Sequence, residues 1–444
     1  MTNHTPRYCC IDLFAGIGGI RAGFERAAGE GMLDTVFVSE IDRYAATTYA
    51  ANYSTPTNLI DGISDLLVNT AGVAIYGDIT KVSDNALSQI PQFDICLAGF
   101  PCQAFSQAGK RMGFEDNYKG MARGTLFREL IRVCDINKPK VVFCENVKGL
   151  LHHDNGNTLQ VILGAFDEAG YAVDFTTLNS SDFGVPQNRE RIYLVAFRKE
   201  LGITSFSFPE GEKTSLRIGD ILEKQPVGGK YYLSQQYLNT LKRHRAKHEK
   251  QGHGFGYQIK KGDDLASTLS CGGMGRERNL VVDSRPHPTG IVAGKHSPIN
   301  TESVRCMTPR EWARLQGFDE DFVLPVADVH LYKQFGNTVT VNVIEAIARR
   351  VLDALDAVYR SREFNVVLNN AIIDCLKKAP MSRQDISLAV DHLFPSSWSR
   401  EKRLEKLSSN LHALKSNGKI NSRGKTKSAV WFLVDPPTTP HNHK

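Results

Sequence analysis

Cys102 is the residue in this sequence that is best placed to act as a nucleophile. It follows an apolar run at 93–97 that predicts a buried strand, and the turn Gly99-Phe100-Pro101 puts it just beyond the carboxyl end of that strand. Open α/β sheets bind their ligands at this edge. A cysteine attacks as its thiolate, which a loop beside basic groups favours. Most free cysteines are simply buried. A nucleophilic role for Cys102 therefore depends on other reactive side chains lying at the same edge of the sheet.

Three more polar side chains accompany predicted strands. Glu145 ends the apolar run 139–144, so it would share the edge of Cys102 if the two strands are parallel. Arg189 and Arg191 alternate with an acid ahead of another strand, and on an extended chain both guanidinium groups face one side. Two neighbouring guanidinium groups need an anionic or carbonyl partner. Together these residues predict an active site at this edge of the sheet.

The first third of the chain has the pattern of a nucleotide-binding fold. A buried strand at 8–14 runs into a glycine turn at 15–19 and a helix pattern at 20–28. Glu40 and Asp78 each follow a later predicted strand, where an acid can hold ribose hydroxyls or an adenine amino group. A glycine turn without a phosphate-binding lysine, followed by two acids, suits an adenosine cofactor without phosphates. S-adenosylmethionine is the natural candidate.

The rest of the chain separates by rhythm and charge. The α/β pattern stops at 198–300, a basic segment of short strands, glycines and loops such as Lys242-Arg243-His244-Arg245, and it returns at 301–360. This segment carries 17 lysines and arginines against 10 acids, and residues 360–444 carry 15 against 7, whereas the remainder has 22 against 31. Two basic segments on an acidic body indicate a polyanionic partner.

Composition excludes several other classes. With 41% hydrophobic residues the chain can form ordinary cores, and no apolar run reaches the about eighteen residues that a membrane span needs. The N-terminus does not look like a signal peptide. Nine scattered cysteines without a CxxC pair argue against structural zinc and a disulfide framework, so no metal is expected and a reducing cytosol fits.

Further elements follow from periodicity and end signals. Thr308-Pro309-Arg310-Glu311 predicts a helix start with a capping box. Strands are predicted at 34–39, 171–178 and 192–197, and helices at 125–133, 158–169 and 341–358. Residues 109–124, with few apolar side chains, predict a long functional loop.

Six motifs in this order resemble the cytosine-C5 DNA methyltransferase family over about residues 8–355. They are the strings Asp12-Leu13-Phe14-Ala15-Gly16-Ile17-Gly18-Gly19, Pro101-Cys102-Gln103-Ala104-Phe105-Ser106, Glu145-Asn146-Val147-Lys148-Gly149-Leu150, Gln187-Asn188-Arg189-Glu190-Arg191, 305–318 and Gln334-Phe335-Gly336-Asn337-Thr338-Val339. The resemblance implies a Rossmann-like, S-adenosylmethionine-dependent methyltransferase sheet over 1–197 and 301–360. It also implies a small, irregular, mostly β target-recognition domain over 198–300.

The resemblance also implies roles for the site residues. The Cys102 thiolate adds to C6 of a cytosine flipped out of duplex DNA, Glu145 donates to N3, and Arg189 with Arg191 holds the base oxygen and the loop in place. The residues expected at S-adenosylmethionine are Phe14, Ala15, Gly16, Gly18, Glu40, Ile41, Asp78, Ile79, Pro101, Leu126, Asn337 and Val339. The residues expected at DNA are Gln103, Ser106, Lys110, Arg111, Thr268, Arg276 and Arg278.

Residues 361–444 lie beyond the family pattern. Helices are predicted at 364–377, after the cap Ser382-Arg383-Gln384-Asp385 with Ala389 facing inward, and along Leu404, Leu407, Leu411 and Leu414. A basic hairpin follows at 420–434. This order predicts a winged-helix-like α+β module, which could place a helix in a DNA groove or serve a protein interaction.

The expected protein is a bacterial modification methyltransferase. It would be a cytoplasmic monomer that acts on duplex DNA and protects host DNA from a cognate restriction endonuclease. Two alternatives remain: an RNA C5 methyltransferase, and a DNA-binding regulator whose tail represses transcription and whose enzyme core is inactive. The basic segments favour duplex DNA, and the complete set of Cys102, Glu145, Arg189 and Arg191 favours an active enzyme.

Overall fold

The protein is described here from a computed structural model, in which contacts divide the chain into two compact units, Met1–Leu352 and Asp353–Lys444. The structure describes residues 7–54, 60–70, 73–101, 117–118, 121–122, 126–252, 256–285, 291–292, 295–296, 299–391, 394, 399–424 and 429–434. None of the helices within these ranges is both long enough and apolar enough to cross a membrane.

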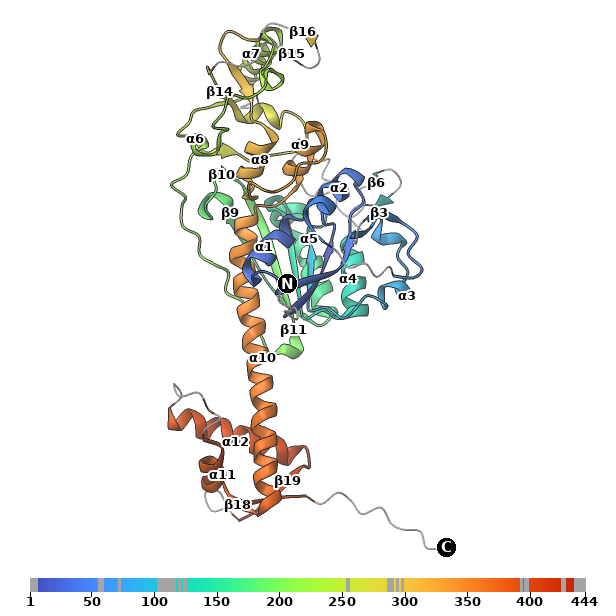
Figure 1. Cartoon of the computed structure of the whole chain (residues 1–444), viewed down its shortest axis with the longest axis vertical. Helices are drawn as coiled ribbons and strands as arrows, with labels where there is room; N and C mark the ends of the chain where they lie inside the picture. Colours follow the sequence, from blue (N-terminus) through green and yellow to red (C-terminus); the bar gives the residue numbers. More distant parts are fainter. Residues whose placement is uncertain are drawn as a thin grey trace. The chain divides into compact units, whose positions relative to one another are not determined.

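An eight-stranded sheet in the order β3-β4-β2-β1-β5-β8-β11-β9 forms the centre of the first unit (Figure 1). The strands are β1 (Tyr8–Leu13), β2 (Leu33–Ser39), β3 (Leu66–Thr70), β4 (Val73–Tyr76), β5 (Ile95–Ala98), β8 (Val141–Val147), β9 (Tyr171–Asn179) and β11 (Glu190–Arg198). The chain builds outward from β1 in one direction through β2 and β4, then in the other through β5 and β8. The topological switch at β1 and β5 is where open α/β sheets bind ligands.

The sheet is mixed rather than wholly parallel. β4, β2, β1, β5 and β8 run parallel, whereas β11 is antiparallel to both β8 and β9, and β3 is antiparallel to β4. Reversal of β11 brings its first residues to the carboxyl end of β8, where Arg191 pairs with Val147. The carboxyl ends of the parallel strands and the start of β11 therefore lie at the same edge of the sheet.

Helices cover both faces of this sheet. On one face, α4 (Leu126–Asn137) and α5 (Asn157–Glu168) bury Phe127 and Phe166 in the same apolar core as Ile11 and Leu13. On the other face, α1 (Gly19–Ala28) packs its Phe24 ring 5.4 Å from the ring of Phe143. The strand-to-helix alternation predicted from the apolar runs is confirmed, and the elements differ from the predicted ranges by a few residues.

In its described residues, the segment after β11 is not mostly β. Its longest element is the helix α7 (Gln235–Lys250), and its strands in the described ranges have two or three residues: β12 (Ile259–Lys260), β13 (Ala266–Ser267), β14 (Leu280–Val282), β15 (Ile291–Val292) and β16 (Lys295–His296). Lys242-Arg243-His244-Arg245, expected in a loop, lies inside α7. Ser234 caps this helix by accepting from the Tyr237 N–H, and Leu238 and Leu241 bury its inner side.

The chain returns to the first unit through α8 (Pro309–Leu315), α9 (Asp328–Asn337) and α10 (Val341–Lys378). The predicted capping box is present: Thr308 Oγ1 accepts from the Glu311 N–H, and the Glu311 carboxylate accepts from the Thr308 N–H. Helices predicted separately at 341–358 and 364–377 form one continuous helix, because no proline or glycine interrupts 341–378.

The second unit contains the last part of α10, β18 (Met381–Ser382), α11 (Arg383–Val390), α12 (Arg400–Ser416), β19 (Ile420–Arg423) and β20 (Val430–Leu433). Its strands form an antiparallel sheet in the order β18-β20-β19. The Ser382 cap is confirmed, whereas Ala389, predicted to face inward, is exposed. The unit has an apolar core of its own, whose buried side chains include Leu368, Ile372, Ile386, Leu407, Leu411, Leu414 and Trp431.

Candidate active site

A strained glycine turn follows β1. Phe14, Gly16 and Gly18 all have left-handed backbones, with φ of 54°, 57° and 82°. For Phe14 this conformation costs on the order of 1 kcal/mol, because its Cβ approaches a carbonyl oxygen. A Cβ on Gly18 would lie 2.3 Å from the Tyr53 ring, whereas one on Gly16 would meet no atom within 4 Å. The turn is tight on one side and open on the other, as a ligand cradle requires.

Glu40 ties the end of β2 to this turn. One carboxylate oxygen accepts from the Gly16 N–H at 2.7 Å, and the other accepts from the Asp42 N–H at 2.7 Å. Burial raises the pKa of Glu40, and these two backbone bonds oppose the rise. Each oxygen keeps a second lone pair for a hydroxyl. Beside it Ile41 is 58% exposed, an apolar surface that a nucleoside would cover.

Asp78 stands at the same edge after β4. It is buried, and its Oδ1 accepts from the Thr80 N–H and hydroxyl at 3.0 and 2.8 Å, which fixes the side chain. Ile79 beside it is also buried. Acids at the ends of two neighbouring strands, an exposed apolar side chain and an open glycine turn fit the adenosine half of S-adenosylmethionine.

The segment after α9 closes against the glycine turn. A Cβ on Gly19 would lie 2.5 Å from Thr338 Oγ1 and 3.0 Å from Val339 Cγ2, so the two segments are in direct contact. Val339 is buried and Asn337 is exposed. Two motifs more than 300 residues apart thus meet at one place. Leu126, the first residue of α4, is half-buried.

The edge shared by β5 and β8 carries the predicted reaction centre. The parallel register pairs Ala98 with Cys144, so the residues after Ala98 run beside Glu145. Asn146 is buried, and its side-chain amide donates to the Phe100 carbonyl at 3.3 Å. That bond fastens the start of the Pro101 loop to β8. Cys102, Gln103, Ser106, Lys110 and Arg111 lie outside the described residues, and so does most of 109–124. Within that segment, β6 (Asn117–Tyr118) and β7 (Met121–Ala122) form a short pair.

Glu145 and Arg191 form an ion pair on this edge. Arg191 Nε lies 3.1 Å from Glu145 Oε1, and both side chains are largely buried. Burial raises the pKa of Glu145, while the charges of Arg191 and Arg189 oppose the rise. A carboxyl group with a raised pKa, held beside a guanidinium group, is suited to donating a proton to a substrate.

Arg189 has a different set of contacts. It lies between β10 (Gln187–Asn188) and β11, is 2% exposed, and donates to the Leu269 carbonyl at 2.8 Å and the Thr338 carbonyl at 2.6 Å. It therefore fastens the 269 segment and the turn after α9 to the catalytic edge. Thr268 belongs to the same junction, because its hydroxyl donates to the Asn188 carbonyl at 2.7 Å.

Arg276 and Arg278, predicted to contact DNA, are exposed on a short 3₁₀ helix at Arg276–Asn279. The Arg276 guanidinium lies 5.4 Å from the centre of the Tyr332 ring. This contact supports its side chain from the side of α9, and its DNA role stays a prediction.

A buried polar network joins segments that the sequence does not connect. Gln187 donates to the Leu315 carbonyl at 2.9 Å and to Gln316 Oε1 at 3.1 Å, and its own Oε1 accepts from the Leu269 N–H at 3.0 Å. Thr340 also donates to Gln316 Oε1, at 2.9 Å. The network joins four chain segments beneath the catalytic edge. The network was not predicted, because its partners come from segments far apart in the sequence.

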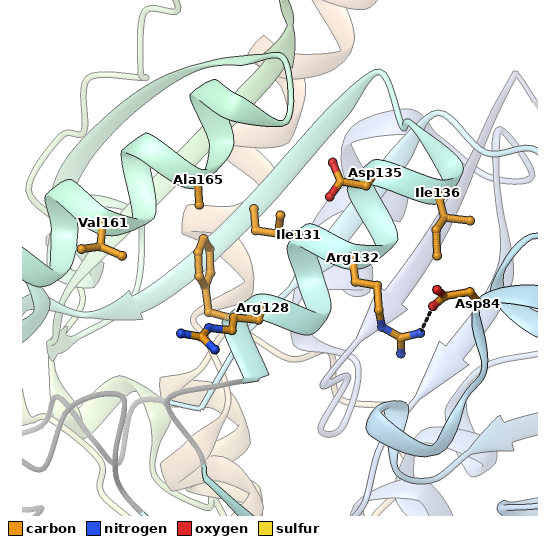
Figure 2. A pocket seen from close by; sticks show the side chains of 9 residues that line it. Asp84, Arg128, Ile131, Arg132, Asp135, Ile136, Val161 and Ala165 are labelled. Atoms are coloured by element: carbon orange, nitrogen blue, oxygen red, sulfur yellow. Dashed lines mark hydrogen bonds and ion pairs between the residues drawn. The ribbon is translucent and has the colours of Figure 1, made fainter.

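A surface hollow of about 480 Å³ lies elsewhere, between α4 and α5 (Figure 2). It is lined by Asp84, Phe127, Arg128, Ile131, Arg132, Asp135, Ile136, Val161 and Ala165. Asp84 and Arg132 form an ion pair at 2.7 Å across one end. None of the lining residues belongs to the predicted site, so the catalytic edge is identified by its side chains and not by this hollow.

Comparison with solved structures supports this architecture. Entamoeba histolytica methyltransferase EhMeth matches with a TM-score of 0.59 and 19% identity, covering 79% of this chain and 99% of that one. S. pombe Dnmt2 matches with a TM-score of 0.55 and 19% identity, again covering 79% and 99%. At these identities the likeness shows the fold, an α/β methyltransferase fold with a large mixed sheet.

Sequence comparison identifies the family. The chain is 46% identical over 363 residues to the type II methyltransferase M.HpaII of Haemophilus parainfluenzae, covering 80% of this chain and 92% of that protein. It is 39% identical over 355 residues to M1.ScrFI of Lactococcus lactis subsp. cremoris, covering 79% and 80%. The model of the family described as C-5 cytosine-specific DNA methylase matches residues 8–353, which include every strand of the catalytic edge. The chain therefore belongs to the C-5 cytosine-specific DNA methylase family and is a DNA cytosine-C5 methyltransferase.

Proposed function

We propose that the enzyme transfers a methyl group from S-adenosylmethionine to C5 of one cytosine within a specific duplex DNA sequence, through a covalent bond between Cys102 and C6. The observation that carries this proposal is the Asn146–Phe100 bond, which holds the start of the Cys102 loop beside the buried Glu145–Arg191 pair. A cytosine stacked in a duplex is out of reach of such a site, so the base is flipped out.

The steps follow from the chemistry of the ring. The Cys102 thiolate forms a bond to C6, and Glu145 donates a proton to N3, so C5 becomes nucleophilic without a full negative charge on the ring. S-adenosylmethionine, when bound, supplies the methyl group that C5 receives. Water then takes the C5 proton, the S–C6 bond breaks, the sulfur leaves as thiolate, and N3 returns its proton to Glu145. Arg191 orients Glu145 and the base oxygen, and Arg189 fastens the surrounding loops.

The cofactor site is assigned to the glycine turn and the two strand-end acids. Phe14 and Ile41 would cover the adenine ring, Glu40 would accept from ribose hydroxyls, and Asp78 would accept from the adenine amino group. The backbone from Ala15 to Gly18, with Pro101, Leu126, Asn337 and Val339, would complete the pocket. Asp78→Ala should weaken binding of S-adenosylmethionine in calorimetry, whereas Cys102→Ser should leave that binding intact.

The biological role proposed is protection of host DNA from a cognate restriction endonuclease in a bacterial cytoplasm. It is supported by the relatives, which are named type II methyltransferases. Plasmid DNA methylated by this enzyme should resist one member of a panel of restriction endonucleases, and bisulfite sequencing would locate the modified cytosine. Resistance to none of the panel, together with no modified cytosine, would contradict the proposal. The protein is proposed to act as a monomer.

An RNA substrate is the alternative with the same chemistry. Duplex DNA is favoured because the segment 198–300 supplies a basic surface, including the exposed Arg276 and Arg278. Label transfer from tritiated S-adenosylmethionine should therefore be far greater to duplex DNA than to tRNA. The opposite preference would reassign the substrate.

The second unit is proposed to be a winged-helix-like module. The end of α10, α11 and α12 precede the hairpin of β19 and β20, and β18 lies between α10 and α11. β18 pairs with β20, which gives the strand order β18-β20-β19. The family match at 8–353 covers the first unit from residue 8 onward, whereas all but the first residue of the second unit lie beyond it. It therefore adds a function of its own rather than part of the methyl-transfer site.

A further inference from the structure

The positive charge of the second unit is concentrated in its second half. Residues 353–391 carry five lysines and arginines against six acids, whereas residues 399–424 carry seven against two. The latter range is α12 and the first strand of the hairpin. An even spread would be expected if the cations served only solubility, so their segregation indicates a negatively charged partner for this part of the unit.

One side of α12 forms the core and the other faces solvent. Leu407, Leu411 and Leu414 are buried, which fixes the inner side of the helix. With 3.6 residues per turn, Ser409 and Ser416 lie on the side opposite these leucines, and both are exposed. The outer side is therefore polar and carries short hydroxyl side chains.

Cations accompany these serines on both sides. Lys402 and Lys406, one turn apart, lie on one flank. Lys415 lies on the other flank, where its Nζ donates to Ser422 Oγ at 2.8 Å on β19. Arg423 follows on β19 and lies 5.3 Å from the centre of the Phe432 ring. The Lys415–Ser422 bond thus links one basic flank of the helix to the hairpin, and Arg423 adds an exposed cation on the next residue of the same strand.

This arrangement matches the shape of a DNA groove. The major groove is about 12 Å wide and admits one α-helix, with a phosphate strand on either side. Cations on both flanks of a helix would meet the two strands, and short polar side chains between them would face the base edges. Glu405 shares the outer side, and a carboxylate there can accept from the cytosine amino group.

We propose that α12 and β19 form a second DNA-binding surface, which inserts α12 into the major groove of duplex DNA independently of the methylated cytosine. Lys402, Lys406, Lys415 and Arg423 contact phosphates, and Ser409 faces the bases. This surface goes beyond the methyl-transfer function and does not depend on it, because it is built within a unit that has its own core. Its occupant is DNA and not another protein because the lysines and arginines of residues 399–424 outnumber the acids seven to two.

The test uses the full chain and a duplex that contains only adenine and thymine, so that no target cytosine is present. Lys402→Glu/Lys406→Glu should weaken binding in fluorescence anisotropy at least about tenfold. The slope of log K against log salt should fall in magnitude by about 1.8, since each lost phosphate contact removes about 0.9. Arg360→Glu/Arg362→Glu, with the same charge change on exposed sites of α10, is the matched control and should change affinity less than about twofold.

The turnover number for methyl transfer at saturating cytosine-containing DNA should be the same in all three proteins. That readout separates this proposal from the proposed function, which fails only if the wild type transfers no methyl group. Equal affinity and equal salt slope for wild type and Lys402→Glu/Lys406→Glu would overturn the DNA-binding surface. A larger loss of affinity for structured RNA than for duplex DNA would also overturn it. If Lys402→Glu/Lys406→Glu unfolds at a lower temperature than the wild type in a thermal scan, Lys402→Gln/Lys406→Gln is used in its place.

Discussion

Arg189 and Arg191 are two residues apart but serve different parts of the molecule. Arg191 pairs with Glu145 at 3.1 Å, whereas Arg189 donates to backbone carbonyls at 269 and 338. Their alternation with Glu190 predicts one shared side, and the charges of both do lower the pKa of Glu145. Their separate partners could not be predicted, because those carbonyls come from segments about 80 and 150 residues away.

The Glu145–Arg191 pair predicts a pH dependence of the rate. Glu145 acts in its protonated form, so activity should fall as pH rises through its pKa, which burial raises and Arg191 restrains. Arg191→Gln removes the restraining charge, so this limb of the pH–rate profile should move to higher pH. Glu145→Gln should lose the limb and about 10²–10⁴-fold in rate. The measurement is the single-turnover rate between about pH 5 and 9. If the fall in rate at high pH occurs at the same pH in Arg191→Gln as in the wild type, the Glu145–Arg191 pairing is contradicted.

Asp12, buried under the glycine turn, predicts a second pH effect, on stability. Burial raises its pKa from 3.8 to about 8, and the Arg21 charge and the Tyr49 hydroxyl, which donates to Asp12 at 3.2 Å, oppose that rise. The folded state therefore holds a proton that the unfolded state releases above about pH 4, so stability falls as pH rises from about 4 to 8. Asp12→Asn should flatten this fall in urea unfolding. Glu168→Gln, at an exposed site of α5, should keep the wild-type profile, and a parallel Asp12→Asn profile would refute the assignment.

At the scale of elements, the helix α7 carries a basic stripe on its outer side. Arg243, Lys247 and Lys250 follow one another at four and three residues, opposite the buried Leu238 and Leu241. We expect this stripe to contact phosphates beside the methylated cytosine.

Reversing the stripe tests this expectation. Arg243→Glu/Lys247→Glu should raise the KM for DNA about tenfold or more and leave the turnover number unchanged, because the stripe supplies none of the residues assigned to the catalytic edge. Lys199→Glu, a charge reversal at a site paired with Asp167 on the catalytic body, is the comparison. Steady-state kinetics at two salt concentrations would show whether the effect is electrostatic; an unchanged KM would exclude α7 from the DNA interface.

The elements differ in how far sequence could define them. The Thr308–Glu311 capping box was predictable because it depends on residues three apart, and β5 and β8 were predictable because each is a short apolar run. α7 was not predicted because its second half consists mostly of basic side chains. Only Leu238 and Leu241 are buried in this helix, and two apolar residues are too few to show a helical period. The Gln187–Gln316–Thr340 network could not be predicted, because it exists only after four distant segments have packed.

At the scale of the whole molecule, the chain joins a family unit to a unit with a separate core. Removing 361–444 should therefore leave methyl transfer at saturating DNA close to wild type, while lowering affinity for duplexes that lack a target site. A methyl-transfer assay paired with anisotropy measures both. Loss of turnover in a truncated protein that still unfolds cooperatively would show that the second unit contributes to catalysis.

The central claim is the bond between Cys102 and C6, and a fluorinated substrate tests it most directly. In duplex DNA amplified with 5-fluorodeoxycytidine triphosphate, C5 cannot lose fluorine as it would a proton, so the enzyme should remain attached after methyl transfer. We predict a protein–DNA adduct that survives denaturing electrophoresis, requires S-adenosylmethionine, and maps by peptide mass spectrometry to Cys102. Cys102→Ala, shown to bind S-adenosylmethionine normally, should give none. An adduct of equal yield in Cys102→Ala, or one mapped to another cysteine, would contradict the account.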